Sequence, residues 1–168
     1  MAFAFPNPSV SVSPQGGGSI AVSAGDSGIL YDDATYKSGF KNFSYTATPA
    51  AGFSFSHFAV TVTADNGGTT STRTVTRNGT ESAGTWTYSP DGRQQSANWI
   101  EDGFGIWFEY YDSDTGDPIP GWYGYVVSIS VVAVFVRVPT HLLVNSSTAE
   151  NPAQLVYDPA TDLLVADN

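Results

Sequence analysis

Apolar and polar residues alternate along most of this chain, which is the pattern of half-buried β-strands. Many of the alternating positions hold β-branched or aromatic side chains, and strands favour these residues. No window of about twelve residues repeats its apolar positions with the period of a helix, so at most one helical turn is expected, near residues 96–102. The pattern predicts strands over residues 19–23, 43–48, 53–63, 69–76, 85–88, 106–111 and 122–138.

Turn-forming sequences separate the predicted strands. Clusters of Gly, Asn, Asp and Pro lie at 16–18, 24–26, 65–68, 78–79, 90–92 and 115–118. Connections this short join antiparallel neighbours, because parallel strands need a longer crossover. The sequence therefore predicts an all-β fold with a compact antiparallel body, either a β-sandwich or a β-grasp-like sheet.

The strongest apolar run lies at 126–136. Its residues after Ser130 are almost all apolar, as in a strand that is buried on both faces. We therefore expect it to be the central strand of the main sheet. The residues expected on its core face are Val131, Ala133 and Phe135, and those expected to be covered on the other face are Val132, Val134 and Val136.

Both ends of the chain differ from the body, so we predict an N-terminal arm at 1–14, a body at 15–138 and a C-terminal appendage at 139–168. In the appendage, apolar residues at 154–157 and 163–166 flank a turn, which predicts a β-hairpin. An isolated hairpin is marginal in water, so its apolar side chains need cover from the body or from another chain. The residues expected to act in assembly, interpreted as one alternating set, are Leu155, Tyr157, Leu163 and Val165.

The chain is strongly acidic, with a formal net charge of −10 and only 6 Lys and Arg residues among 168. A nucleic-acid-binding protein needs a basic surface to neutralise phosphates, so that class of partner is excluded. Membrane insertion is not expected, because no apolar run reaches about 18 residues. The absence of cysteine excludes disulfides and thiol catalysis. The first residues lack the basic segment and the apolar core of a cleaved signal peptide, so none is expected.

No catalytic signature emerges from the sequence. His57 and His141 lie in strand-like contexts, where a half-buried structural histidine is the simpler interpretation. Four carboxylates lie among aromatic residues, as the paired carboxylates of glycosidases do, but nothing in the pattern marks a pocket; they are Glu101, Asp102, Glu109 and Asp112. We therefore expect that the protein is not an enzyme.

The candidate metal site is the loop that contains Asp112, Asp114 and Asp117. Ca²⁺ prefers several carboxylate oxygens at close spacing. The loop does not fit the EF-hand pattern, which places a Glu where this chain has Tyr123 and a Gly where it has Asp117. A bound Ca²⁺ is thus one hypothesis, and a polar hairpin loop whose Asp, Ser and Gly satisfy the turn backbone is the other. No further cofactor is expected.

The segment 99–125 is rich in aromatic residues. Both faces of a strand belong to the core only if the sheet is covered on both sides, so some of these rings should be exposed or buried by a partner. Exposed Trp and Tyr side chains serve as sugar-stacking platforms and as anchors of protein interfaces. We expect Phe108 and Tyr110 in the core. The residues expected to face a partner are Trp107, Tyr111 and Trp122.

Part of the body also carries a recognisable motif. It begins with Gly17-Gly-Ser-Ile-Ala-Val-Ser23, continues with Phe43-Ser-Tyr-Thr-Ala-Thr-Pro-Ala-Ala-Gly-Phe-Ser-Phe55 and closes with Ser130-Val-Val-Ala-Val-Phe135. This resembles the internalin-type B-repeat and related β-rich repeats of bacterial surface proteins, and residues 48–53 match the most specific block. The segments 26–41 and 66–121 are longer than such repeats have, and His57-Phe58 stands where the repeats have a Trp. The resemblance implies a compact β-domain for spacing and adhesion, without catalysis.

These observations favour a non-enzymatic structural or decorating protein of a large extracellular assembly, in particular a bacteriophage virion. A bacterial-surface motif without an expected signal peptide fits a protein released by lysis, and apolar strand-forming ends suit strand addition to neighbours. The partners would be neighbouring copies or other virion proteins. One alternative is a carbohydrate- or host-surface-binding module that uses the aromatic patch. Another is a secreted adhesin fragment of a bacterial surface.

Overall fold

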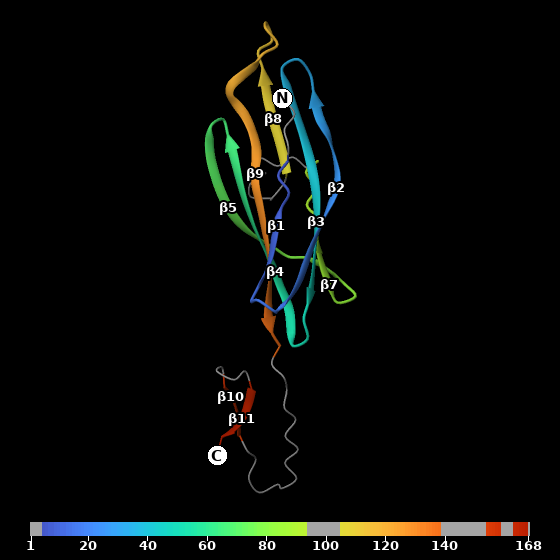
Figure 1. Cartoon of the computed structure of the whole chain (residues 1–168), viewed down its shortest axis with the longest axis vertical. Helices are drawn as coiled ribbons and strands as arrows, with labels where there is room; N and C mark the ends of the chain where they lie inside the picture. Colours follow the sequence, from blue (N-terminus) through green and yellow to red (C-terminus); the bar gives the residue numbers. More distant parts are fainter. Residues whose placement is uncertain (1–4, 94–104, 139–153, 159–162, 168) are drawn as a thin grey trace.

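The computed structural model describes residues 5–93, 105–138, 154–158 and 163–167, and every helix or strand assigned in them is a β-strand (Figure 1). This confirms the predicted all-β class, and the helical turn expected at 96–102 lies outside the described residues. The strands are β1 (Ser9–Ser13), β2 (Gly18–Asp32), β3 (Tyr36–Pro49), β4 (Phe53–Asn66), β5 (Thr69–Arg77), β6 (Thr80–Ser82), β7 (Thr85–Tyr88), β8 (Gly105–Tyr111), β9 (Pro118–Arg137), β10 (Gln154–Asp158) and β11 (Leu163–Asp167).

One curled sheet forms the body, with the strand order β5-β4-β9-β8-β3-β7-β6 and with β1 added to β9 and β2 added to β3. Its pairs are antiparallel except that β1 runs parallel to β9. Strand β8 pairs with the first half of both β3 and β9 and so joins them. Farther along, β7 pairs with β3 and β1 pairs with β9, so the long strands part into two layers (Figure 1).

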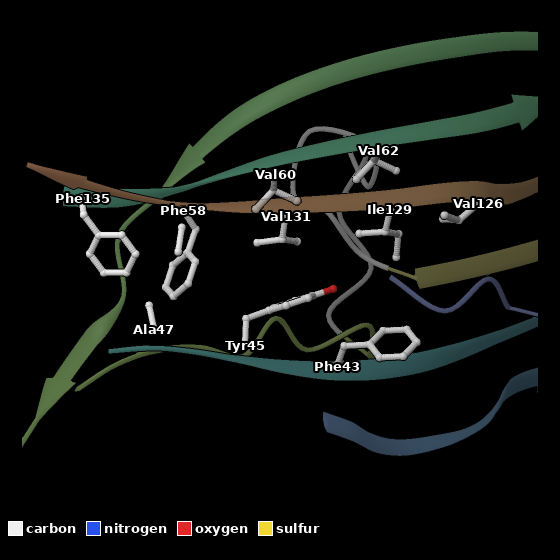
Figure 2. Close-up of a cluster of buried hydrophobic side chains, with 11 residues drawn as sticks. Phe43, Tyr45, Ala47, Phe58, Val60, Val62, Val126, Ile129, Val131 and Phe135 are labelled. Carbon is white, nitrogen blue, oxygen red and sulfur yellow. The ribbon is translucent and has the colours of Figure 1, made fainter. Parts of the chain in front are cut away.

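The core fills the space between these two layers (Figure 2). Every second residue of β4 from Phe58 to Ala64 is 1% exposed or less, and the alternating residues of β3 from Phe43 to Ala47 face them. The period of two in the sequence thus becomes one core face and one outer face on each strand. The buried cluster comprises Phe43, Tyr45, Ala47, Phe58, Val60, Val62, Val126, Ile129, Val131, Ala133 and Phe135.

Strand β9 is a central strand, as the apolar run predicts. It lies between β4 on one side and β8 and β1 on the other, and the three residues expected on its core face are all buried. On the other face Val132 and Val134 are half-buried, but Val136 is 49% exposed, so the prediction that it is covered is wrong. The reason is that β1 ends opposite Val134, which leaves Val136 beyond the last pair of that ladder.

The turn predicted at 24–26 is wrong, because β2 continues through it to Asp32. A shift in register between Ala24 and Ser27 absorbs the turn-forming residues, and Asn42 Nδ2 donates a 2.8 Å hydrogen bond to the carboxylate of Asp26. The chain turns instead after Asp33, whose carboxylate accepts the backbone N–H groups of Thr35 at 2.7 Å and Tyr36 at 2.8 Å. The segment 26–41 is therefore mostly a long hairpin that extends the sheet.

Residues 9–13 of the predicted N-terminal arm form β1, which belongs to the body's own sheet. Val10 and Val12 pack against the core, whereas Ser9 and Ser11 are exposed on the outer face. At the other end, β10 and β11 pair with each other in a sheet of their own, which confirms the C-terminal hairpin.

Candidate functional site

The aromatic residues of β8 and β9 lie in two rows that cross three strands. Trp107 of β8 pairs with Tyr125 of β9 and with Gly39 of β3. In the next row, Glu109 of β8 pairs with Tyr123 of β9 and with Lys37 of β3. Because directly paired residues share a face of the sheet, the side chains of these two rows form one surface.

Trp107 lies on a glycine. A Cβ atom added to Gly39 would meet Nε1, Cε2 and Cζ2 of the indole at 2.5, 2.7 and 2.9 Å, so the ring covers the bare backbone at this position. Any larger residue at position 39 would displace the ring, because atoms cannot approach this closely. Trp107 is half-buried. The edge of the indole that carries Nε1 therefore lies against β3.

Tyr111, the third residue of the same face of β8, is half-buried and tied to its neighbours. Its hydroxyl donates a 2.5 Å hydrogen bond to Glu109 Oε2, and this bond raises the pKa of Tyr111 to about 12. The ammonium group of Lys37 lies 4.9 Å from the centre of the Tyr111 ring and 3.4 Å from a carboxylate oxygen of Asp32. Glu109 and Tyr111 therefore lie on the same face of β8 as Trp107.

Tyr123 and Tyr125 complete this surface, although the sequence pattern predicts no role for either of them. Their ring centres are 5.8 Å apart and their ring planes differ by 18°. Both are half-buried. The signal that could have identified them was their spacing of two, which places them on one face of a strand.

Three expectations for this segment have different outcomes. Tyr110, expected in the core, is 39% exposed, and its ring contacts Tyr36 with 4.9 Å between centres. It lies on the face of β8 opposite Trp107, near the end of the strand, where the sheet covers it only partly. The side chains of Phe108 and Trp122 lie outside the described residues.

Hydroxyl groups continue the same outer face toward the other end of the sheet. Thr61 of β4 shares a 2.8 Å hydrogen bond between hydroxyls with Thr74 of β5, and Thr63 shares a 2.9 Å bond with Thr72. On the opposite side of β4, Ser130 and Ser128 of β9 pair with Thr61 and Thr63. The alternating Thr and Ser residues predicted strands, but sequence reasoning did not show that their hydroxyls would meet across strands.

Asp65 links the hydroxyl part to the aromatic part of this face. It follows Thr61 and Thr63 with the strand period on β4 and pairs with Tyr125 of β9. Its Oδ1 atom accepts the backbone N–H of Gly68 at 2.8 Å, which caps the predicted turn between β4 and β5. The face therefore continues along β4 from the Thr rows to Asp65, while β9 has a register shift between Ser128 and Val126.

The loop between β8 and β9 is a capped turn. The Asp112 carboxylate accepts the backbone N–H groups of Asp114 at 2.8 Å and Thr115 at 3.1 Å, and the Asp112 carbonyl accepts the N–H of Gly116. Asp112, Asp114 and Asp117 are exposed, and the described residues contain no group of three or more His, Cys, Asp or Glu placed to hold a metal ion. The arrangement fits the hypothesis of a polar hairpin loop.

Of the residues considered for catalysis, those that the structure describes, His57, Glu109 and Asp112, lie on two different strands and in a loop. His57 is half-buried on β4, and its Nδ1 lies 3.0 Å from the hydroxyl of the neighbouring Ser56. Glu109 belongs to the aromatic surface, hydrogen-bonded to Tyr111. Glu101, Asp102 and His141 lie outside the described residues.

The register of the C-terminal hairpin corrects the predicted assembly residues. Leu155 pairs with Ala166 and Tyr157 with Leu164, whereas Leu163 pairs with Asp158 and Val165 with Val156. Paired positions share a face, so Leu155 and Tyr157 belong to one set and Leu163 and Val165 to the other. The four residues therefore do not form one alternating set. The two strands are shifted by one residue from the register that would pair Leu155 with Val165 and Tyr157 with Leu163. The side chains of these four residues lie outside the described part of the structure.

No family model and no curated protein matches this chain. Among the described residues, no helix is long and apolar enough to span a membrane.

Proposed function

We propose that this protein is a non-enzymatic structural or decorating component of a large extracellular assembly, a bacteriophage virion in particular. In this proposal the body is a rigid β-module, and the C-terminal hairpin joins it to neighbouring subunits, which include copies of the same chain.

The observation that carries the proposal is that β10 and β11 pair in a sheet of their own. Two-stranded hairpins are marginal in water unless a third strand or another surface covers them. Both sets of register positions in this hairpin contain apolar residues, with Leu155 and Leu164 in one set and Val156 and Val165 in the other. A hairpin of this composition gains most from cover on both faces, which a neighbouring subunit provides.

The arrangement of strands in the body also supports a rigid body and an assembling hairpin. Strand β1 is held in the body's own sheet by its pairing with β9 and by the packing of Val10 and Val12. Strand β1 is therefore already paired within the body, so we assign the pairing between subunits to the C-terminal hairpin. Long continuous strands such as β3 and β9 also give the stiffness that an assembly component needs.

Charge and motif suggest the setting. A net charge of −10 keeps identical subunits soluble and opposes nonspecific association, so specific contacts must bring them together. The resemblance to repeats of bacterial surface proteins supports an extracellular assembly that meets bacteria. A virion component meets both conditions.

The test is sedimentation of three forms at micromolar concentration: the full chain, a chain without residues 139–168, and Val156→Pro. Proline at position 156, in the middle of β10, is disfavoured inside a strand because it fixes φ and lacks an N–H, so it disrupts the hairpin. The matched control is Ser113→Pro, in the exposed loop after β8 at the second position of a turn, where proline is accepted.

We expect the full chain and Ser113→Pro to self-associate, and the other two forms to sediment as folded monomers. A full chain that stays monomeric, or a Val156→Pro variant that associates equally well, would contradict assembly through the hairpin. Unfolding of the body upon removal of 139–168 would show instead that the hairpin is part of its core.

A further inference from the structure

We infer that the C-terminal hairpin of one subunit adds to the outer edge of β5 in a second copy of this chain and so extends its sheet. The inference rests on the proposed function, since it takes the hairpin as the assembly element, and it names the surface that receives the hairpin. On the face of β5 toward the core, the residues that carry the inference are Arg73, Val75 and Arg77, which pair with buried residues of β4.

Strand β5 is the last strand at one end of the sheet. Among the described strands, only β4 pairs with it, and Figure 1 shows β5 along the outside of the body. All of its residues except Val75 and Arg77 are exposed. In an antiparallel pair the ladder bonds alternate, so every second residue of an edge strand turns its N–H and C=O groups outward. Such a row of backbone groups is a template for a further strand.

The edge of β5 is also regular. Edge strands are commonly disrupted by bulges or prolines, which oppose pairing with another chain. Strand β5 contains no proline, and its register with β4 is unbroken from Thr69 to Arg77. By contrast, the long strand β2, whose ladder is with β3, has two register shifts. At the β6 end of the sheet order, β6 has only three residues. The long edge that suits strand addition is therefore that of β5.

The spacing of residues in the hairpin matches that of β5. Val75 is half-buried and packs against the core at this edge, with an arginine two residues before it and another two residues after it. Strand β10 contains Val156-Tyr-Asp158 and β11 contains Val165-Ala-Asp167, so each has a valine and an aspartate at the same spacing. Residues two apart share a face of a strand. Whichever hairpin strand adds to β5, and in either direction, a valine placed beside Val75 brings an aspartate beside an arginine.

Charge distinguishes β5 from the other long edge. The segment 69–77 contains two of the six Lys and Arg residues of the chain and no Asp or Glu. Strand β2 contains Asp26 and Asp32 and no cation. Each hairpin strand contains one aspartate and no cation. Because opposite charges on neighbouring strands attract and like charges repel, the hairpin is favoured at β5 over β2, and two β5 edges are opposed to pairing with each other.

An exchange of charge between the two surfaces tests the inference. One variant reverses the edge, with Arg73→Glu and Arg77→Glu, and a second reverses the hairpin, with Asp158→Arg and Asp167→Arg. Each full-length variant is sedimented alone at micromolar concentration, and the two are also sedimented as an equimolar mixture. In the mixture, each variant supplies the surface that matches the reversed surface of the other.

The matched control is Lys37→Glu with Lys41→Glu on β3, which changes the net charge by the same amount as the edge variant and leaves β5 intact. Thermal unfolding establishes that each variant is folded. If the reversed edge variant does not fold, Arg73→Gln with Arg77→Gln takes its place, because it removes the attraction without adding carboxylates beside β4.

We expect the full chain and the β3 control to associate equally, each reversed variant alone to associate about tenfold more weakly or less, and the mixture to recover the association. Higher salt should weaken the association of the full chain. A folded edge variant that associates like the full chain, or a mixture that fails to recover, would overturn the inference and leave the proposed function intact, since the hairpin would then join another surface, such as a second hairpin. A monomeric full chain would overturn the proposed function itself.

Discussion

Replacing Phe135 by alanine tests how the core of the body is built. Phe135 is 2% exposed on β9, and its ring meets that of Phe55 edge-on with 6.0 Å between centres. On its other side the ring reaches the first residue of β2, where a Cβ on Gly18 would lie 2.6 Å from Cζ. The ring, which projects from β9, therefore packs against both β4 and β2.

The expected cost follows from what surrounds the ring. Neighbours such as Phe55 are large and are held by further ring contacts, for example with Trp86 at 5.3 Å, so the space cannot collapse fully when the ring is removed. Deleting a buried Phe side chain in such surroundings costs about 3–5 kcal/mol. Since domains are typically stable by roughly 5–15 kcal/mol, this would be a large part of the total.

Urea unfolding followed by tryptophan fluorescence measures this cost. The matched control is Val136→Ala, at the next residue of the same strand, whose side chain is 49% exposed and should cost no more than about 0.5 kcal/mol. We expect the midpoint to fall steeply for Phe135→Ala and to stay nearly constant for Val136→Ala. A cost below about 1 kcal/mol for Phe135→Ala, or equal costs for both variants, would refute the placement of Phe135 in the core.

Three further outcomes are expected. Gly39→Ala should destabilise the body by about 1–3 kcal/mol in the same urea assay, because its Cβ would overlap the indole of Trp107; an unchanged urea midpoint would contradict this close approach. The Asp33 carboxyl should titrate by NMR with a pKa of about 2, lowered by hydrogen bonds from Tyr31 and from the N–H groups of Thr35 and Tyr36. The stability that this carboxylate contributes is present above its ordinary pKa of 3.8 and is lost as the pH falls through about 2. An ordinary pKa for Asp33 would contradict the capped turn. Millimolar Ca²⁺ and EDTA should give equal melting midpoints, because the Asp112 carboxylate already accepts two backbone N–H groups; a rise with Ca²⁺ would revive the metal hypothesis.

Alternation along the chain predicts which residues become strands and which of them share a face. It placed Val131, Ala133 and Phe135 of β9 in the core correctly. It does not tell which strands pair, because that depends on contacts between residues far apart in sequence. The parallel pairing of Ser9 with Ser130 is an example, and it turns a predicted arm into part of the body.

Local turn signals also mislead where other contacts satisfy the same residues. Asp26 looks like part of a turn, but its bonds to Asn42 and Arg93 keep it within a bulged strand. The predicted set of assembly residues in the hairpin was wrong for another reason: a shift of one residue in the register moves a side chain to the opposite face. No feature of the local pattern fixes that offset. The seating of Trp107 on Gly39 was likewise hidden, since only the pairing of β3 with β8 brings the two together.

Sedimentation equilibrium of the full chain beside the form without residues 139–168 tests most directly whether the hairpin joins subunits. We expect the full chain to have a mass above that of one 17.8 kDa subunit at micromolar concentration, and the shortened form to be a folded monomer. A full chain with the mass of a single subunit at every concentration examined would contradict assembly through the hairpin.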